Sequence, residues 1–303
     1  MEFIVLVLAL LIRLVLSAMP SKKHDLWFNL WCDRCSGPIG GNVEQTDAVR
    51  VPAKKWGIGT LMVSVVLPVI ILGVALELLT QVAWGLPAFA LSLLILLYSF
   101  SREDSEDWFK QFQRAWRRGD HQAAYEYARQ VIPKHTINSE YELFLSVFSR
   151  LLYLRFCDFF MVLFWFMVLG AEGALLVRLS QLLDCDRVSP LVLRIRWLLE
   201  WLPARLLGIS FMLTGHISRG GKVWLATLFN GYTPTEHLLY RYARAAMDHN
   251  ENPEIISDNR SQVLSDEYQK LLSLEGFMQR SVILWLMVIA LATILVDFYI
   301  PTG

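Results

Sequence analysis

The sequence predicts an all-α, polytopic integral membrane protein with five to six membrane helices, a cytoplasmic helical hairpin and amphipathic helices. Hydrophobic residues make up 55% of the 303 residues and charged residues only 18%, whereas soluble domains carry about 25% charged residues. The mean hydropathy is positive, at +0.41. Long apolar blocks alternate with polar, charge-dense segments, which is typical of chains that cross lipid repeatedly.

Five apolar blocks are long enough to cross a bilayer, which needs about 20 residues at a rise of about 1.5 Å each. They are 57–80, 84–100, 156–179, 197–217 and 281–299. The N-terminal block is a sixth candidate, and it is interrupted by Arg13. Because it begins with Glu2 instead of a basic region, we favour a retained helix over a secretory signal peptide.

The distribution of Lys and Arg predicts the orientation of the chain. Segment 18–56 carries six of them, 101–150 carries eight and 218–280 carries seven, whereas 180–196 carries three and 81–83 none. Cytoplasmic loops carry the excess of basic residues, so we expect the three large loops to be cytoplasmic. The totals of Lys+Arg and Asp+Glu are 28 each, and this balance gives no support for a nucleic-acid partner.

Three regions follow from this pattern. Residues 1–100 are expected to hold the first membrane helices and a cytoplasmic loop at 20–56, and residues 151–303 the last membrane helices with a cytoplasmic loop at 218–280. Between them, 101–150 should form a helical hairpin, because apolar residues recur at helical spacing on both sides of Gly119-Asp120. Packing of this hairpin on the rest of the chain and docking of a partner both remain open.

Segment 222–248 also has helical periodicity, with a break at Asn230-Gly231. Thr233 or Thr235 is expected to cap its second helix. A stripe of apolar residues on that helix should face the protein: Leu238, Leu239, Tyr242 and Ala246.

No complete metal or catalytic motif is present in the sequence. Cys32 and Cys35 form a CxxC, but only His24 lies near them, so a tetrahedral zinc set is not apparent and no metal is expected. Residues 215–223, GHISRGGKV, miss the phosphate-binding loop because glycine and valine stand where lysine and a hydroxyl residue belong. We therefore expect no cofactor, with nucleotide binding as a weak alternative.

Ionisable residues inside the apolar blocks are the most informative feature, because each costs about 2.5–3.5 kcal/mol near the bilayer centre. They are Glu77, Arg155, Asp158, Glu172, Arg178, Glu200 and Arg205. Pro203 lies between Glu200 and Arg205 and has no N–H, so a carbonyl is freed to accept from a side chain. Structural ion pairs and a ligand site in a polar cleft both remain open.

Two pairs of small residues, Gly170 with Ala174 and Ala204 with Gly208, have the spacing that lets helices approach closely. We expect them to bring the third and fourth membrane helices together.

These segments together resemble the AmpE family, inner-membrane proteins described as regulatory signalling modulators of β-lactamase induction. The resemblance covers nearly the whole chain. Departures are Glu172 where proline is usual and Val177 where tyrosine is usual. The matching stretches are FKQFQRAWRRGDHQAA at 109–124, FWFMVLGAEGALLVRL at 164–179, LLEWLPARLLGISFMLTG at 198–215 and RSVILWLMVIALATIL at 280–295.

The AmpE family is in turn similar to the membrane cobinamide-phosphate synthases of cobalamin biosynthesis. Pro203, Ala204, Arg205 and Leu206 match a Pro-Ala-Arg-Leu stretch of those synthases. Segment 138–150, NSEYELFLSVFSR, retains part of their carboxylate-rich motif without the full pattern.

The resemblance implies a bacterial inner-membrane sensor or modulator in β-lactamase induction and cell-wall recycling. It does not decide whether the protein is an enzyme, and we favour a non-enzymatic role because no complete catalytic motif is present. The protein would act through its cytoplasmic loops on a protein partner or a muropeptide-type ligand. The alternative is a membrane enzyme related to cobinamide-phosphate synthase, and a carrier ranks last because no internal repeat is visible. The candidate ligand-binding residues are Arg205, Glu200, Asp158, Arg178, Glu140 and Glu142.

Overall fold

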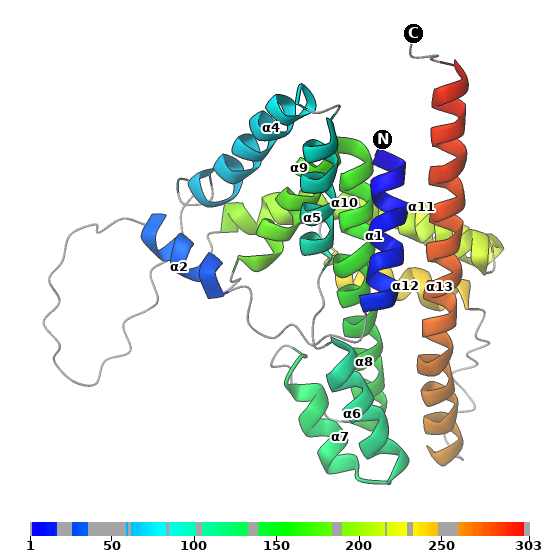
Figure 1. Cartoon of the computed structure of the whole chain (residues 1–303). Helices are drawn as coiled ribbons and strands as arrows, with labels where there is room; N and C mark the ends of the chain where they lie inside the picture. The colour runs from blue at the N-terminus through cyan, green and yellow to red at the C-terminus, as the bar shows by residue number, and fades with distance from the viewer. Residues whose placement is uncertain are drawn as a thin grey trace, which may run out of the picture. The chain divides into compact units, whose positions relative to one another are not determined.

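The computed structural model describes residues 2–16, 26–35, 59, 62–82, 85–100, 105–132, 139–183, 190–215, 217–228, 233–247 and 260–299. Within these ranges all regular secondary structure is helical, which confirms the all-α class. The helices form two compact units: Met1–Arg102 with Met161–Glu200, and Glu103–Phe160 with Trp201–Gly303 (Figure 1). The cytoplasmic loop predicted at 20–56 lies largely outside the described residues.

The first unit is built around α5 (Leu86–Ser99), which packs against three other helices. These are α1 (Glu2–Leu16), α4 (Leu67–Thr80) and α9 (Val162–Leu182). A π-helical turn, η1 (Met62–Val66), leads into α4 and contacts α2 (Leu26–Cys35). Helix α1 is the helix that the sequence predicts in the N-terminal block.

Helix α9 is broken at Gly170, whose φ of 68° and ψ of −152° lie outside the helical region. A residue with a side chain rarely adopts these angles, so glycine is required here for its backbone conformation. Gly170 therefore bends the helix, which is a different role from the helix-packing role that its spacing predicts. On the far side of the break, Glu172 lies against Gly73 of α4, where a built Cβ would be 3.3 Å from Glu172 Oε1.

The second unit contains α6 (Ser105–Arg117), α7 (His121–Arg129), α8 (Glu140–Arg155), α11 (Ile217–Thr227), α12 (Thr235–Ala246) and α13 (Arg260–Tyr299). Helix α10 (Pro190–Thr214) begins in the first unit and ends in the second. Helices α6 and α7 form the predicted hairpin, and Asp120 caps α7 by accepting a hydrogen bond of 3.0 Å from Ala123 N.

The hairpin packs on α8 through an aromatic core. Phe112 and Trp116 of α6 meet the ring of Phe144 edge-on, at centroid distances of 6.0 and 4.5 Å. Tyr268 of α13 approaches the same Phe144 ring at 6.4 Å and accepts a hydrogen bond from Arg117 Nε. The apolar periodicity of α6 thus identified its buried face correctly.

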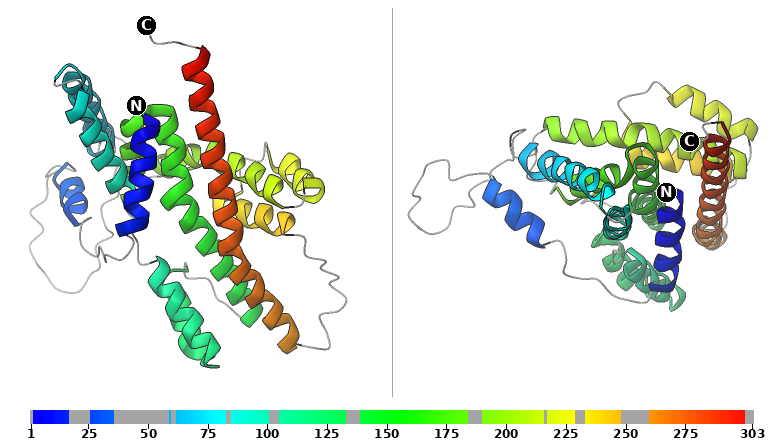
Figure 2. Two further views of the ribbon diagram at one scale, coloured as in Figure 1. Left: turned by 45° about the vertical axis from the view of Figure 1, so that its right-hand side comes forward. Right: turned by 45° about the horizontal axis from the view of Figure 1, so that its top comes forward.

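Helices α8 and α13 run parallel to one another (Figures 1 and 2). Phe144 contacts Tyr268 near the start of both helices, and Phe160, in the π-helical segment η3 (Phe156–Met161) that continues α8, contacts Trp285. Since the two helices advance together, they would enter a membrane from the same side. The N-terminal ends of α8 and α13 then lie on one side, and the cytoplasmic placement of 101–150 and 218–280 stays a prediction.

Three helical stretches among the described residues are long and apolar enough to cross a membrane. They are Met62–Thr80, Glu140–Leu182 and Leu271–Val288, and Leu86–Ser99 is a shorter apolar helix. This confirms the membrane class, while the number of spans and the spanning role of 197–217 stay predictions. Large apolar side chains on α4 are exposed, as lipid-facing side chains are: Leu67, Ile70, Ile71, Val74 and Leu78.

The sequence misplaces the close approach at Gly208. A Cβ built there would lie 2.6 Å from the Tyr242 ring and 3.1 Å from Trp224. Gly208 therefore accommodates α12 and α11 and not the third membrane helix. On α12 the predicted stripe of Leu238, Leu239, Tyr242 and Ala246 is buried, as expected. The predicted threonine cap is wrong, because Pro234 occupies the N-cap position without a side-chain hydrogen bond.

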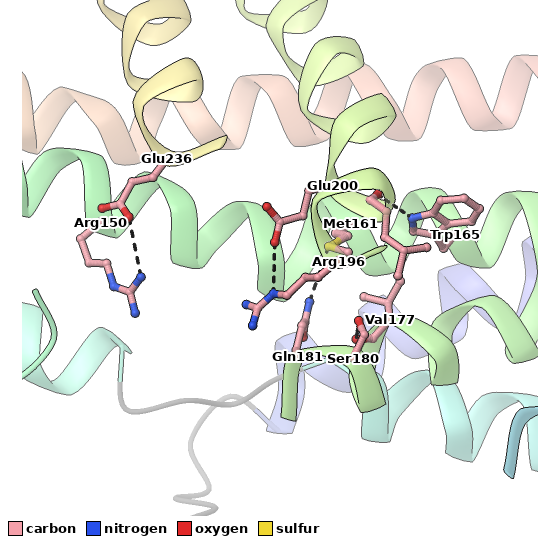
Figure 3. A network of polar contacts seen from close by, with 10 residues as sticks. Arg150, Met161, Trp165, Val177, Ser180, Gln181, Arg196, Glu200 and Glu236 are labelled. Carbon is pink, nitrogen blue, oxygen red and sulfur yellow. Dashed lines mark hydrogen bonds and ion pairs between the residues drawn. The ribbon is translucent and has the colours of Figure 1, made fainter. Parts of the chain in front are cut away.

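The carbonyl that Pro203 leaves without a helical donor is that of Leu199, four residues earlier. Trp165 of α9 donates its indole N–H to this oxygen at 3.1 Å (Figure 3). The sequence-based prediction that Pro203 frees a carbonyl for a side chain is thus confirmed. The bond ties α9 to the first half of α10.

We expect Gly208→Ala to lower the free energy of unfolding by about 1–3 kcal/mol, the usual cost of overpacking. The added methyl group would overlap the Tyr242 ring. Gly276→Ala is the matched control, since no atom lies within 4 Å of a Cβ at that position in α13. Thermal unfolding in detergent should show a loss for Gly208→Ala alone, and equal behaviour of the two variants would contradict the packing described for Gly208.

We expect Trp165→Phe to cost about 1 kcal/mol of stability, because it removes the donor to Leu199 O. In a Pro203→Ala background the same change should cost less, since an alanine in place of the proline supplies a backbone N–H to that carbonyl. A double-mutant cycle of unfolding free energies measures this coupling. Identical costs in the two backgrounds would show that the proline does not create the indole site.

Candidate functional site

Arg205 is the predicted site residue whose guanidinium contacts can be described nitrogen by nitrogen. Its side chain is buried, and all three guanidinium nitrogens point to backbone carbonyls. Nε donates to Leu228 O at 2.9 Å, Nη1 to Trp201 O at 3.0 Å and Nη2 to Thr227 O at 3.5 Å. The guanidinium also lies 4.2 Å from the centre of the Trp201 ring, within the range of a cation–π interaction.

The carbonyls of Thr227 and Leu228 are at the C-terminal end of α11, where a helix has carbonyls without helical donors and a partial negative charge. Arg205 thus completes α11 and joins it to α10. Trp224 of α11 in turn donates a hydrogen bond from its indole N–H to Arg205 O at 3.0 Å. The arrangement is an arginine cap of a helix, built from both the side chain and the backbone of Arg205.

Tyr242 closes this cluster from α12. Its hydroxyl lies 2.9 Å from Thr227 Oγ1, and its ring fills the space above Gly208. Burial raises the pKa of Tyr242 above its ordinary value, and the Thr227 hydrogen bond and the charges of Arg205 and Arg241 oppose this rise. Tyr242 is therefore a neutral hydroxyl that packs and donates, as a buried helix contact requires.

Glu200 and Arg178 belong to the first unit and have separate partners there. Glu200 is buried and accepts a hydrogen bond from Arg196 Nε at 3.3 Å, one helical turn earlier (Figure 3). Arg178 is buried in α9, and its guanidinium carbon lies 5.9 Å from the centre of the Tyr98 ring of α5. Each contact lets a charged group lie among apolar helices at lower cost.

Asp158 lies in the π-helical segment η3 and is buried. It shares the second unit with Arg205, whereas Glu200 and Arg178 are in the first. Convergence of these residues on one ligand site therefore stays a prediction.

Glu140 and Glu142 lie in the first turn of α8. The hydroxyl of Ser139 accepts a hydrogen bond of 3.1 Å from Glu142 N, so Ser139 caps the helix and Glu142 is three residues further on. This is the spacing of a capping box, and carboxylates in a first turn also interact well with the helix dipole. Both glutamates therefore stabilise the start of α8, and a ligand-binding role for them stays a prediction.

A second polar cluster, between α8 and α12, was missed by sequence reasoning. Arg244 donates to the hydroxyls of Tyr141 and Tyr240, and Arg150 pairs with Glu236 at 3.8 Å (Figure 3). Burial lowers the pKa of Arg244, but the two tyrosine hydroxyls outweigh this effect and its pKa lies above the usual value. The i, i+4 spacing of Tyr240 and Arg244 was a local signal, but nothing in the sequence pointed to Tyr141.

The CxxC lies on α2, with Cys32 buried and not in a disulfide. Among the described residues, no three His, Cys, Asp or Glu side chains gather in a way that could hold a metal ion. His24 lies outside the described residues.

Two curated proteins resemble part of the chain, and both are named cobalamin biosynthesis protein CobD. The one from Chromobacterium violaceum is 37% identical over 84 residues, which cover 25% of this chain and 27% of that protein. The one from Stutzerimonas stutzeri is 38% identical over 74 residues, 22% of this chain and 24% of that protein. The chain thus spans about a quarter of the length of these relatives, and no solved structure matches it.

The family model described as "Regulatory signalling modulator protein AmpE" matches residues 49–294, which include α4 to α12 and most of α13. The match therefore includes the hairpin, the Arg205 cap and parts of both compact units, and α1 and α2 precede it. The chain belongs to the AmpE family.

Proposed function

We propose that the chain is an inner-membrane modulator of β-lactamase induction that responds to cell-wall recycling. It would act through its cytoplasmic segments on a protein partner or a muropeptide-type ligand. The family match over residues 49–294 carries this proposal, because the family is described by a regulatory signalling role. The membrane-spanning character of the helices is consistent with such a role.

The second unit offers a physical route for a signal. The hairpin packs on the first half of α8 through Phe144, and the same ring contacts α13 through Tyr268. Both helices then continue into apolar stretches that can cross lipid. A partner or ligand that shifts the hairpin would therefore displace two membrane-entering helices together, since packed cores transmit small shifts.

The alternative is a membrane enzyme related to cobinamide-phosphate synthase, acting on a phosphorylated substrate. The two partial matches to CobD proteins favour it. Arginine recognises phosphate by directing its N–H fork at the oxygens. In this structure the fork of Arg205 is directed at the carbonyls of Trp201, Thr227 and Leu228, so we place the regulatory function first.

Deletion of the gene should change β-lactamase induction several-fold, and a plasmid copy should restore it. Nitrocefin hydrolysis after exposure to an inducing β-lactam measures the enzyme, and chromatography of the cytosolic muropeptides measures the recycling pool. A copy with Phe144→Ala tests the route through α8, because it removes the ring that joins the hairpin to α13. Unaltered induction and unaltered muropeptide pools in the deletion strain would contradict the proposed function.

Arg205→Ala should lower the free energy of unfolding by about 3 kcal/mol, because buried carbonyls lose charged donors. Arg205→Lys should recover part of this loss, since one ammonium group can satisfy fewer of the carbonyls. Thermal unfolding in detergent measures both variants. Calorimetric titration of the wild-type protein with ATP and GTP should be flat. Nucleotide binding that Arg205→Ala abolishes without a loss of stability would favour the enzyme instead.

A further inference from the structure

Helix α9 reverses its direction at Gly170. Gln181, near the end of α9, donates a hydrogen bond from Nε2 to Met161 Sδ at 3.9 Å (Figure 3). In a straight helix twenty residues rise about 30 Å, so these two side chains could not meet. A Cβ built at Gly173 would overlap Trp165 O, so the two legs also touch beside the break. Helix α9 therefore returns toward the end at which it begins, and we call this feature the α9 reversal.

The helices that follow α10 pack on the first half of α8. Arg244 of α12 donates to the Tyr141 hydroxyl at 3.1 Å, and the ring of Tyr240 meets that of Phe148 edge-on at 5.6 Å. From the start of α8 to Gly170 the helical run rises about 45 Å, whereas the hydrocarbon core is about 30 Å thick. The first turns of α8 then lie outside the hydrocarbon, and α12 lies beside them.

Both ends of α10 are thereby placed on one side of the membrane. The α9 reversal brings the chain back before α10 begins, and the contacts of α12 with α8 hold it there after α10 ends. The 25 residues of α10 are long enough to cross lipid, at about 38 Å. However, α10 is not among the described stretches that are also apolar enough to do so. This arrangement differs from the span that the sequence predicts at 197–217.

The distribution of charge agrees with this placement. Segment 180–196 carries three Lys and Arg residues, which the sequence-based prediction placed on the side opposite to the other basic segments. If α10 begins on the side from which α8 enters, all the basic segments lie together. Only the turn at 81–83, which has no Lys or Arg, then remains on the other side with the chain ends. Such an asymmetry is typical of membrane proteins.

An apolar stripe follows one side of α10, with steps of four, four, three and four residues between its members. Three of them are well exposed, with relative exposures of 57% for Leu198, 42% for Leu202 and 56% for Leu213. The opposite side of the helix is buried, with Leu207 and Phe211 fully covered. The stripe consists of Leu198, Leu202, Leu206, Ile209 and Leu213.

The surroundings of α10 indicate that lipid covers this stripe. Helix α10 follows α9, which belongs to the apolar run Glu140–Leu182. Its last turns touch α13, where the rings of Phe211 and Phe277 lie 5.0 Å apart, and Phe277 is in the apolar stretch Leu271–Val288. Trp201 lies in the first half of α10, and tryptophan is enriched at the boundary between membrane and water. An interfacial helix places its apolar face against the acyl chains at this boundary.

We propose that α10 does not cross the membrane and lies in the phospholipid interface on the side from which α8 enters, with the apolar stripe against the acyl chains. The Arg205 cap, which joins α10 to α11, is then on the same side as the hairpin of α6 and α7. This inference goes beyond the proposed function and does not depend on it, because it uses only the contacts of the helices and the membrane class.

Cysteine accessibility tests the side on which α10 begins. The full chain, with its four native cysteines replaced by alanine, carries one new cysteine: Arg194→Cys in α10, Gln122→Cys in the hairpin or Gln81→Cys after α4. All three positions are exposed. A membrane-impermeant maleimide is added to spheroplasts and to disrupted membranes. Arg194→Cys should label under the same condition as Gln122→Cys, whereas Gln81→Cys should label under the opposite one.

The other end of α10 is tested in the same way with Lys222→Cys, an exposed position in α11, which should also match Gln122→Cys. If Arg194→Cys labels as Gln81→Cys does while Lys222→Cys matches Gln122→Cys, then α10 crosses the membrane and the inference is wrong. Thermal unfolding in detergent compares each variant with the wild-type protein, so that a change of labelling caused by misfolding is recognised.

Photo-cross-linking identifies what covers the stripe. The full chain carries p-benzoylphenylalanine in place of Leu202 and is irradiated in cells. Mass spectrometry should identify a phospholipid adduct, whereas the same residue in place of Gln122 should give none. No adduct at Leu202, or adducts only with a soluble protein or a second copy of the chain, would overturn the lipid occupant. Leu198 is the second position if the Leu202 variant unfolds. Neither experiment measures β-lactamase induction, so its failure is distinguishable from failure of the proposed function.

Discussion

Every polar group that this chain buries among apolar helices needs a partner within the chain, because water is not there to supply one. The Arg205 guanidinium meets this constraint by donating hydrogen bonds to carbonyl oxygens of α10 and of the end of α11. The indole of Trp165 meets it for the carbonyl that Pro203 leaves open. In both places the hydrogen bond joins two helices. The same contact therefore supplies a partner for a buried polar group and holds the helices together.

The second unit is also held together by contacts between aromatic rings. Aromatic rings from α6, α8 and α13 gather around Phe144, and a second ring pair, Phe160 with Trp285, keeps α8 and α13 in register further along. Two contacts separated by about the same number of residues on both helices define a parallel pair. Under the proposed function, a signal received outside the lipid would reach the helices inside it through this pair.

Local patterns in the sequence were enough to predict several elements. The spacing of the apolar residues of α6, the break at Gly119-Asp120 and the buried stripe of α12 are properties of a single helix or turn, and all were confirmed. The free carbonyl at Pro203 was predictable for the same reason, since the effect of proline is local. Its donor, Trp165, comes from another helix and was not predictable.

Contacts between distant segments could not be read from the sequence in this way. The small residue Gly208 indicates a close approach but not the identity of the approaching helix, which is α12. Arg205 was recognised as costly to bury, but its partners are backbone carbonyls, which carry no residue-specific signal. Periodicity determines which side of a helix is buried, and the tertiary fold determines what it is buried against.

The roles of the charged residues bear on the choice between enzyme and regulator. Glu142 lies in the capped first turn of α8, Glu200 pairs with Arg196 on its own helix, and Arg205 closes the end of α11. A catalytic group must direct its polar atoms toward a substrate, whereas the side-chain contacts seen for Glu200 and Arg205 hold helices in place.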